Sequence, residues 1–198
     1  METVKWFNDV LGEEALKREK IKEVLSNNFK LYGFEYAETP IIEYEEFVKK
    51  GNENDEVISD IFKLKDKGNR NLALRYEFTF QLKRISKNKK LPYKRYQIGS
   101  VFRDEPVTSN RFREFTQCDI DVVGSGYKDD AEILKITSKI LNELGIKYDI
   151  YFNSRRLLNE ILEKNGIKEK EEVLREVDKL DKLTEKEVKD NLKKYKAE

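Results

Sequence analysis

The chain has 198 residues, with 40 lysines and arginines against 39 aspartates and glutamates, no histidine, one cysteine and three prolines. Hydrophobic residues make up 38% of it, enough to build a core despite the 40% of charged residues. A net charge of +1 excludes a general basic field, so any contact with nucleic acid must come from local patches. The single cysteine, Cys118, excludes a disulfide framework and a multi-cysteine zinc site. Without histidine, any chemistry must depend on carboxylates, arginine, lysine and backbone groups.

The apolar residues of the sequence do not form the pattern of a membrane span or a signal peptide. No apolar run approaches the roughly 20 residues that span a bilayer. The first 20 residues, which carry acidic side chains early, lack the apolar stretch of a signal peptide. We therefore expect a soluble protein in the cytoplasm.

The first third of the chain predicts a helix followed by a strand. Residues 13–32 place apolar side chains at helical spacing, and Gly33 is suited to end the helix. The stripe consists of Ile21, Val24, Leu25, Phe29 and Tyr32. The next segment, 34–40, is short and ends at Pro40, which favours an extended strand with a fixed end.

The middle of the chain predicts strands. The turn sequence at 66–71 separates two strand-like runs, 61–65 and 72–80. Two longer candidates, 94–105 and 111–123, are joined by a short segment and so favour an antiparallel pair.

The last third predicts helices, with one further strand. Residues 129–145 form an amphipathic pattern that Asp129 can cap and Gly145 can end, and residues 148–153 are typical of a strand. From residue 154 onward the chain predicts short, highly charged helices, with capping-box spacing between Thr184 and Glu187. Because this tail has little apolar surface, we expect it to pack on another part or partner.

The alternation of side chains assigns a polar face to each of the three central strands, because successive residues point to opposite faces. The simplest interpretation is a solvated face. Three details favour a ligand instead: this face carries Gln, Thr, Asp and Arg, Gly99 permits close approach, and Phe115 could stack on a planar group. Carboxylates at one end would suit an ammonium or ring N–H, and arginines at the other would suit a polyphosphate.

Two blocks of this region resemble motif 2 of the class II aminoacyl-tRNA synthetases. They are F-R-D-E at 102–105 and N-R-F-R-E-F-T-Q-C-D-I-D-V-V-G at 110–124, in the version of histidyl-tRNA synthetases. The segment L-R-Y-E-F-T at 74–79 is similar to that family's histidine-binding signature, in its archaeal and eukaryotic form with Tyr in place of Pro. The segment Y-G-F-E-Y-A-E-T-P-I-I-E-Y-E-E-F-V-K-K-G at 32–51 resembles motif 1. Further blocks follow the family to residue 183, so the resemblance covers nearly the whole chain.

The resemblance implies a role for particular side chains. Arg103 would hold the α-phosphate of ATP and the carboxylate of the amino acid, and would stabilise charge as the carboxylate attacks phosphorus. Glu105 would lie near the adenine, Phe115 would stack on the base, and Arg111 would reach the γ-phosphate. Mg²⁺ would accompany ATP. The residues implied for histidine binding are Glu77, Thr79, Gln117 and Asp121.

The resemblance also implies the reaction and the partners. Histidine would be activated to an adenylate and transferred to tRNA(His), by a homodimer formed through motif 1 at about residues 20–45. The family's third motif and its anticodon-binding domain are not found in this sequence, so a second chain or a missing half would complete the site. The alternative is a stand-alone paralogue with a binding or regulatory function, comparable to the regulatory subunit of ATP phosphoribosyltransferase. The first interpretation is favoured because Arg103, Arg111, Phe115 and the residues implied for histidine binding are all retained, and a purely regulatory paralogue need not keep arginines that would read ATP.

The expected fold is α/β, in the α+β sense: a mostly antiparallel, incomplete class II synthetase-like sheet flanked by helices, with a small C-terminal helical appendage. Residues 1–153 would be a partial catalytic domain, with motif 2 at about 94–124, and residues 154–198 a helical inserted region. A sheet without its later strands has an open edge, which would favour pairing with a partner. Asn110 departs from the glycine that the family usually has in the motif 2 loop.

Overall fold

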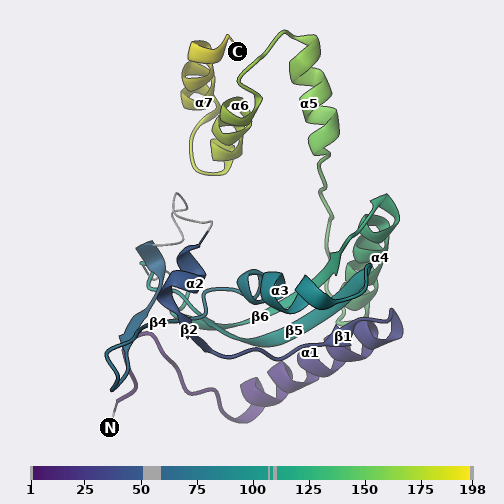
Figure 1. Ribbon diagram of the computed structural model, residues 1–198. Helices are drawn as coiled ribbons and strands as arrows, with labels where there is room; N and C mark the ends of the chain where they lie inside the picture. The colour runs from purple at the N-terminus through teal and green to yellow at the C-terminus, as the bar shows by residue number, and fades with distance from the viewer. Residues whose placement is uncertain (1, 51–58, 107, 109–110, 197–198) are drawn as a thin grey trace. The chain divides into compact units, whose positions relative to one another are not determined.

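The structure is a computed structural model that describes residues 2–50, 59–106, 108 and 111–196 (Figure 1). Asn110 and the end of the motif 1 segment, residue 51, lie outside the described residues. The chain forms two compact units, Met1–Tyr148 and Asp149–Glu198. Within the described residues, no helix combines the length and the apolar character needed to cross a membrane.

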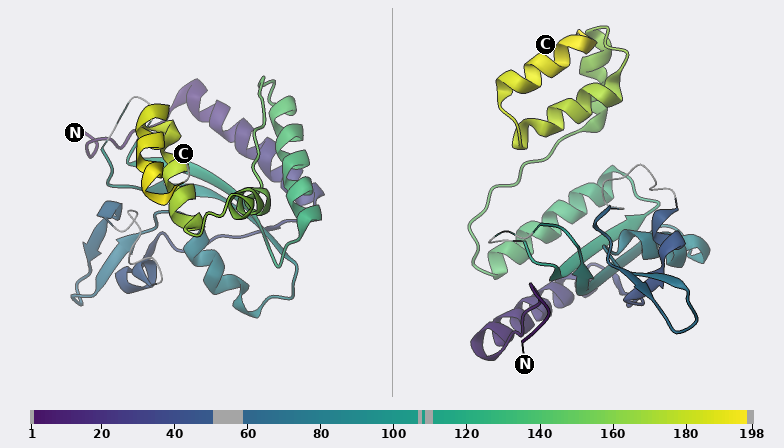
Figure 2. Two further views of the ribbon diagram at one scale, coloured as in Figure 1. Left: turned by 90° about the horizontal axis from the view of Figure 1, so that it is seen from above. Right: turned by 90° about the vertical axis from the view of Figure 1, so that its left-hand side faces the viewer.

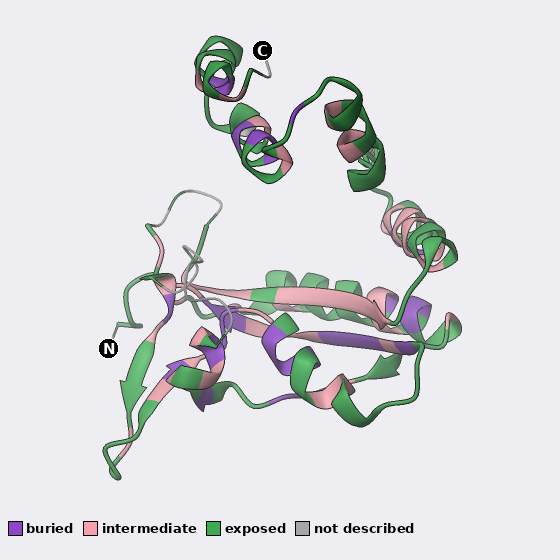
Figure 3. Ribbon diagram, turned by 45° about the horizontal axis from the view of Figure 1, so that its top comes forward, coloured by how far each residue is buried: buried purple, intermediate pink, exposed green. Residues whose placement is uncertain are grey.

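The main sheet of the first unit has three strands in the order β1–β5–β6. The central strand, β5 (Tyr93–Phe102), pairs with β6 (Glu114–Val123) in antiparallel register along its whole length. The short β1 (Glu35–Tyr36) pairs with β5 in parallel. This confirms the predicted antiparallel pair and the mostly antiparallel α/β fold. Among the described residues β6 is an edge strand, and Figure 3 shows it half-buried beside the more deeply buried β5.

Two long helices, α1 (Gly12–Leu31) and α4 (Tyr127–Glu143), pack on one face of this sheet (Figure 2). Val24 and Phe29 of α1 and Ile136 and Ile140 of α4 form a core with Tyr96 of β5. Both helices were predicted, and both end where a glycine takes a positive φ. One predicted contact is wrong: Ile21 is 43% exposed, because the apolar stripe of α1 reaches the sheet only in its second half.

A second, smaller sheet lies beside the first, in the order β2–β4–β3 and antiparallel throughout. Its strands are β2 (Ile42–Tyr44), β3 (Lys63–Lys65) and β4 (Asn71–Leu74). The predicted turn joins β3 to β4, where one carboxylate oxygen of Asp66 accepts hydrogen bonds from the backbone N–H groups of Gly68 and Arg70, both at 3.0 Å.

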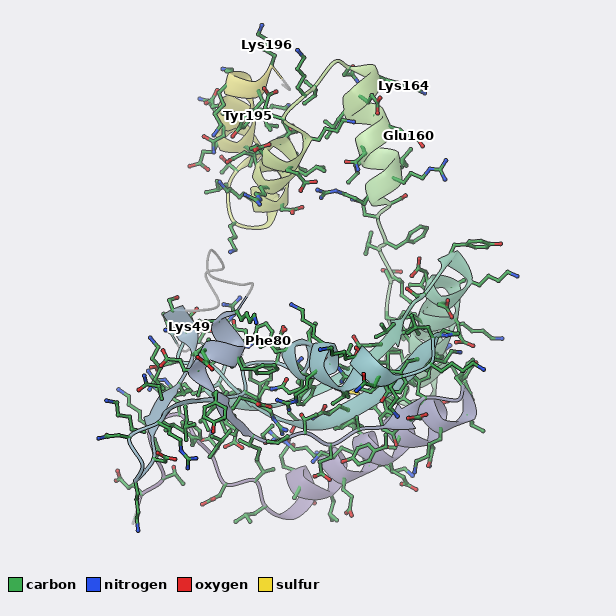
Figure 4. The ribbon with its side chains drawn as sticks, viewed as in Figure 1. Lys49, Phe80, Glu160, Lys164, Tyr195 and Lys196 are labelled. Carbon is green, nitrogen blue, oxygen red and sulfur yellow. The ribbon has the colours of Figure 1, made fainter. Side chains whose placement is uncertain are left out.

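Two short helices accompany the smaller sheet: α2 (Glu45–Lys49) and α3 (Thr79–Ile85), the latter continued by a 3-10 turn, Ser86–Asn88. Val48 of α2 and Phe80 of α3 share a core cluster with Tyr76. Figure 4 labels Phe80, which is a buried residue of α3, and Lys49, which is the last residue of α2.

Two of the predicted strands are wrong. The run 72–80 leaves the sheet after Leu74 and enters α3 at Thr79. The N–H of Arg75 still donates to the carbonyl of Ile41, next to β2, but its carbonyl accepts from the N–H of Phe102 in β5 of the other sheet. Residues 148–153 have no strand partner among the described residues, and Tyr151 is 92% exposed. An alternating pattern permits a strand, but pairing requires a free neighbour.

The second unit is helical, as predicted, with α5 (Arg155–Lys164), α6 (Lys170–Val177) and α7 (Glu185–Leu192). Two 3-10 turns, Asp178–Asp181 and Lys193–Tyr195, follow α6 and α7. The unit has a core of its own, in which Val173 and Val188 are buried and Tyr195, labelled in Figure 4, packs at the border. The predicted capping box is confirmed: the Thr184 side chain accepts from the N–H of Glu187, whose carboxylate accepts from the Thr184 N–H.

Candidate active site

The main sheet turns one face away from α1 and α4, and this face carries the candidate site. Tyr96 and Ile120 point into the core beneath the two helices. Because alternate residues of a strand point to opposite faces, Gln97, Gln117 and Asp119 point the other way. The predicted division between an apolar and a polar face is therefore confirmed for β5 and β6, but not for the run 72–80, which is not a strand of this sheet.

Gly99 creates space on the polar face, and a protein side chain fills it. A Cβ atom added at Gly99 would lie 2.8 Å from Nη2 of Arg75. The Arg75 guanidinium donates from Nε to the carbonyl of Ser100 at 2.7 Å and from Nη1 to the carbonyl of Thr39 at 2.8 Å. The absence of a side chain at Gly99 thus serves a buried arginine that joins three segments, where the sequence suggested approach by a ligand.

Arg103 lies just beyond the end of β5, held between two aromatic rings. Its guanidinium carbon lies 4.3 Å from the centre of the Tyr76 ring and 5.0 Å from that of Phe115. Nη2 is 3.4 Å from the amide oxygen of Gln117, and the backbone N–H donates to the carbonyl of Arg113. The side chain is 29% exposed. Arg103 is therefore an oriented cation at one end of the polar face, accessible on one side.

Glu105 connects three neighbouring side chains at the same end. It accepts a hydrogen bond from the hydroxyl of Tyr76 at 2.8 Å and one from Nη1 of Arg111 at 3.4 Å. Its carboxylate is also 4.0 Å from Nη1 of Arg103. Burial, together with the bond to Glu105, raises the pKa of Tyr76 to about 12, so the phenol remains a donor. Arg111 is largely exposed, and its contact with Glu105 holds the guanidinium at this end of the face.

The middle of the face is acidic. The side-chain amide of Gln117 donates to both carboxylate oxygens of Asp119, at 2.9 and 3.0 Å. Burial raises the pKa of Glu77, and the negative charge of Asp119 raises it further, against the opposing effect of a bond from Thr79. Thr79 itself is exposed at the first turn of α3. Thr79 thus bonds to Glu77, Gln117 bonds to Asp119, and the two carboxylates influence each other by charge.

Asp121 lies farther along β6, opposite Arg95 of β5. Nη2 of Arg95 lies 3.0 Å from a carboxylate oxygen of Asp121. Arg113, whose carbonyl bonds to Arg103, is eight residues from Asp121, or about 26 Å along an extended strand. The structure therefore brings together two groups of the predicted residues, with Gln117 between them, rather than one. The carboxylate end is also not purely acidic, as the sequence suggested, because Arg95 lies there.

Sequence reasoning missed three residues of this face. As one continuous strand, the run 72–80 would put Tyr76 on the face of Leu72 and Leu74, opposite Glu77. Asp119 belongs to the predicted polar face but was given no role. Arg95 could have been found from the strand pairing, since counting back from the turn places it opposite Asp121.

The opposite face of the sheet contains a cavity of about 640 Å³. It lies between the first half of α1 and the ends of β5 and β6 nearest Arg103, and its lining includes Ile21, Ile98 and Thr116. Cys118 also contacts it and, as expected, belongs to the apolar face; burial raises the pKa of its thiol to about 12. This cavity is separate from the polar face, although Phe115 borders both.

The mostly antiparallel sheet backed by two helices has the fold of the class II aminoacyl-tRNA synthetases. The solved structure of a histidyl-tRNA synthetase from a Nostoc species superimposes with a TM-score of 0.81 at 28% identity, covering 100% of this chain and 46% of that one. The histidyl-tRNA synthetase family profile matches residues 6–196. The chain belongs to the histidyl-tRNA synthetase family.

Curated relatives agree with this assignment. Histidine–tRNA ligase 1 of Bacillus cereus is 40% identical over 190 residues, which cover 92% of this chain and 44% of that protein. The chain therefore spans less than half the length of this relative. The relatives and the Nostoc protein are bacterial, so they give no support to the archaeal or eukaryotic form suggested at residues 74–79.

A further solved structure shares the fold. It is an ATP phosphoribosyltransferase regulatory subunit/histidyl-tRNA synthetase from Bacillus halodurans, with a TM-score of 0.65 and 24% identity over 74% of this chain and 38% of that one. At this identity the likeness shows the fold alone.

Proposed function

We propose that this chain is the ATP- and histidine-binding part of a histidine–tRNA ligase. The observation that carries the proposal is the position of Arg103, fixed between Tyr76 and Phe115 and next to Gln117. A cation fixed in this way can stabilise the charge that develops when the carboxylate of an amino acid attacks the α-phosphorus of ATP. In that step a bond forms between carboxylate oxygen and phosphorus, and the bond from phosphorus to pyrophosphate breaks.

The surrounding residues fit ATP with its Mg²⁺ as substrate. Arg111 is exposed and held near Arg103 through Glu105, so it can swing toward the γ-phosphate. The Arg103 side chain is 29% exposed, which leaves part of it accessible to a phosphate or carboxylate oxygen. Phe115 would stack on the adenine and Glu105 would lie near it. With ATP bound, Mg²⁺ would neutralise its phosphates.

The acidic part of the face fits the amino acid. Glu77, Thr79 and Gln117 would surround the amino group of histidine, and Asp121 would accept the imidazole N–H. Transfer of the histidyl group to tRNA(His) would follow. Because Tyr76 stands in place of Pro, we propose that the histidine-binding signature at 74–79 has the archaeal and eukaryotic form.

The proposal extends to the rest of the assembly. Because the chain spans 44% of the length of its Bacillus cereus relative, we propose that sequence outside it supplies motif 3 and the anticodon-binding domain. Residues 1–153 would then be part of the catalytic domain and residues 154–198 an inserted helical region. The protein would act in the cytoplasm as a homodimer. Apolar side chains exposed around motif 1 support the dimer: Ile21, Leu31, Tyr36, Ile41, Ile42 and Tyr44.

Calorimetric titration of the chain with Mg·ATP and with histidine tests the proposal. We expect both to bind, Arg103→Gln to lose ATP binding, and Arg70→Gln to keep it. Arg70 is a matched control because it also pairs with a carboxylate, that of Asp66, but lies in a distant turn. Histidine-dependent exchange of pyrophosphate into ATP should appear only when a chain carrying the remaining half is added.

Three other results would decide against parts of the proposal. Binding of histidine without ATP is what a regulatory paralogue would give. Failure to bind either ligand, even with the second half present, would exclude the synthetase function for this chain. Exchange by the isolated chain at the rate of a whole ligase would contradict the claim that its catalytic set is incomplete.

A further inference from the structure

Arg95 and Asp121 form an unusual ion pair across β5 and β6. The two residues are directly opposite in the register, so their side chains share the polar face. Arg95 is fully buried at 0% exposure, whereas the Asp121 side chain is 27% exposed. The pair therefore has a fully buried cation and a carboxylate whose oxygen nearest Arg95 is buried, while the rest of the Asp121 side chain stays partly exposed.

Stability does not explain a buried arginine at this position. Arg95 pairs with Asp121 by charge, but its one side-chain hydrogen bond among the described residues goes to the carbonyl of Phe78, at 3.3 Å. Its Nε and Nη1 have no partner there, and neither does the Asp121 oxygen nearest to it. A buried guanidinium with unsatisfied donors is costly, and a well-packed apolar side chain in its place is often neutral or stabilising. The amide of Gln81, fully buried on α3, also lacks a partner there. This part of the face is thus more polar than folding requires.

The charges near Asp121 oppose one another. Burial raises the pKa of its carboxyl and Asp119 raises it further, whereas Arg95 lowers it. Of the charged residues on α3, Arg84 is engaged with Glu43 and Lys83 lies over the ring of Phe80. Arg95 is therefore the cation that favours an ionised Asp121, the form that accepts N–H donors most strongly.

We propose that Arg95 is a positioning residue that fixes the Asp121 carboxylate toward the polar face and sets the affinity of this chain for histidine. The proposal rests on the proposed function, because it takes histidine as the ligand of Asp121. Arg95 touches Asp121 and the carbonyl that precedes α3, so it also ties the helix to the acidic end of the sheet. Its own buried position keeps it out of direct contact with substrate.

The test is calorimetric titration of the 198-residue chain with histidine between pH 5 and pH 8, comparing wild type with Arg95→Leu and Arg95→Lys. At pH 7 we expect Arg95→Leu to bind histidine at least roughly tenfold more weakly, since truncating one partner of a buried charge pair is costly. Arg95→Lys should recover part of this loss. The affinity for Mg·ATP should stay within about twofold, because Arg95 lies some eight strand residues from Arg103.

The pH profile separates positioning from a merely structural role. Without Arg95 the pKa of Asp121 rises further, so histidine binding should be lost at a higher pH as the solution is acidified. Arg84→Leu is the matched control: it removes an arginine that pairs with buried Glu43, at 2.7 Å, away from the polar face. It should lower stability but leave the pH profile of histidine binding unchanged.

The outcomes distinguish this inference from the proposed function. If wild type binds histidine and Arg95→Leu binds it with the same affinity and pH profile, the role of Arg95 is refuted and the proposed function stands. If Arg84→Leu shifts the profile as much as Arg95→Leu, the effect is structural and the inference also fails. If folded wild type does not bind histidine at any pH, the proposed function fails and this inference fails with it.

Discussion

The guanidinium of Arg103 lies 4.3 Å from the centre of the Tyr76 ring, and the hydroxyl of the same ring donates to Glu105. One side chain thus orients both a cation and a carboxylate at the end of the polar face. The two effects have different chemical origins, the ring face for Arg103 and the hydroxyl for Glu105, so substitutions can separate them.

Replacing Tyr76 with alanine should weaken ATP binding by about tenfold, because cation–π support for a partly desolvated guanidinium is worth about 1–2 kcal/mol. Tyr76→Phe keeps the ring and should retain most of the affinity. Calorimetric titration with Mg·ATP measures both. Because Tyr76 is buried, Tyr76→Ala should also destabilise the fold by about 3–5 kcal/mol, so its binding is compared only under conditions where circular dichroism shows a folded chain. Equal affinities in the two variants would contradict a role for the ring.

Local patterns in the sequence predicted the elements that depend on local signals. The turn at Asp66, the helix end at Gly33 and the capping box of Thr184 each need only neighbouring residues, and each is present in the structure. The pairing of β5 with β6 was predictable because a short connection joins two long alternating runs. The polar face followed from the same alternation.

The features that sequence reasoning missed depend on distant contacts. The run after Leu74 alternates as a strand would, but the bonds of Arg75 to Phe102, Ser100 and Thr39 end the strand there. The residues next to Arg75 in the sequence do not indicate these distant partners. Because the chain leaves the strand before Tyr76, the alternation of the sequence does not predict where the Tyr76 side chain lies. The cation–π contact with Arg103 could therefore not be foreseen.

The contact between Gly99 and Arg75 predicts a substitution effect without any ligand. Gly99→Ala should lower the free energy of unfolding by about 1–3 kcal/mol, because the new methyl group would meet the Arg75 guanidinium at 2.8 Å. Urea denaturation followed by fluorescence of Trp6 and of the tyrosines measures the loss. In the double variant with Arg75→Lys, the thinner side chain should leave room for the methyl group. The cost of Gly99→Ala should therefore be smaller in that background, and an equal cost in both would contradict the contact.

Cys118 predicts a slow reaction with thiol reagents. Burial raises the pKa of its thiol to about 12, so almost none of it is thiolate at pH 8, and only the thiolate reacts. Alkylation by iodoacetamide at pH 8 should be at least roughly 100-fold slower in the folded chain than in urea. The rate should still rise as the pH is raised from 8 to 10, since the folded thiol is far from fully ionised there. A fast reaction that levels off near pH 9 would contradict the raised pKa.

The apolar side chains exposed around motif 1 predict self-association. Leu31 is 73% exposed and Ile41 is 45% exposed, on elements that the family resemblance assigns to a dimer interface. Replacing either with glutamate should weaken the dimer by at least roughly tenfold, since an unpaired charge would be buried on association. Sedimentation velocity over a range of concentrations measures the change. Leu157→Glu is the matched control, because Leu157 is also exposed, at 54%, but lies on α5 in the second unit. Wild type that stays monomeric at high concentration, or a control as damaging as Ile41→Glu, would refute association through motif 1.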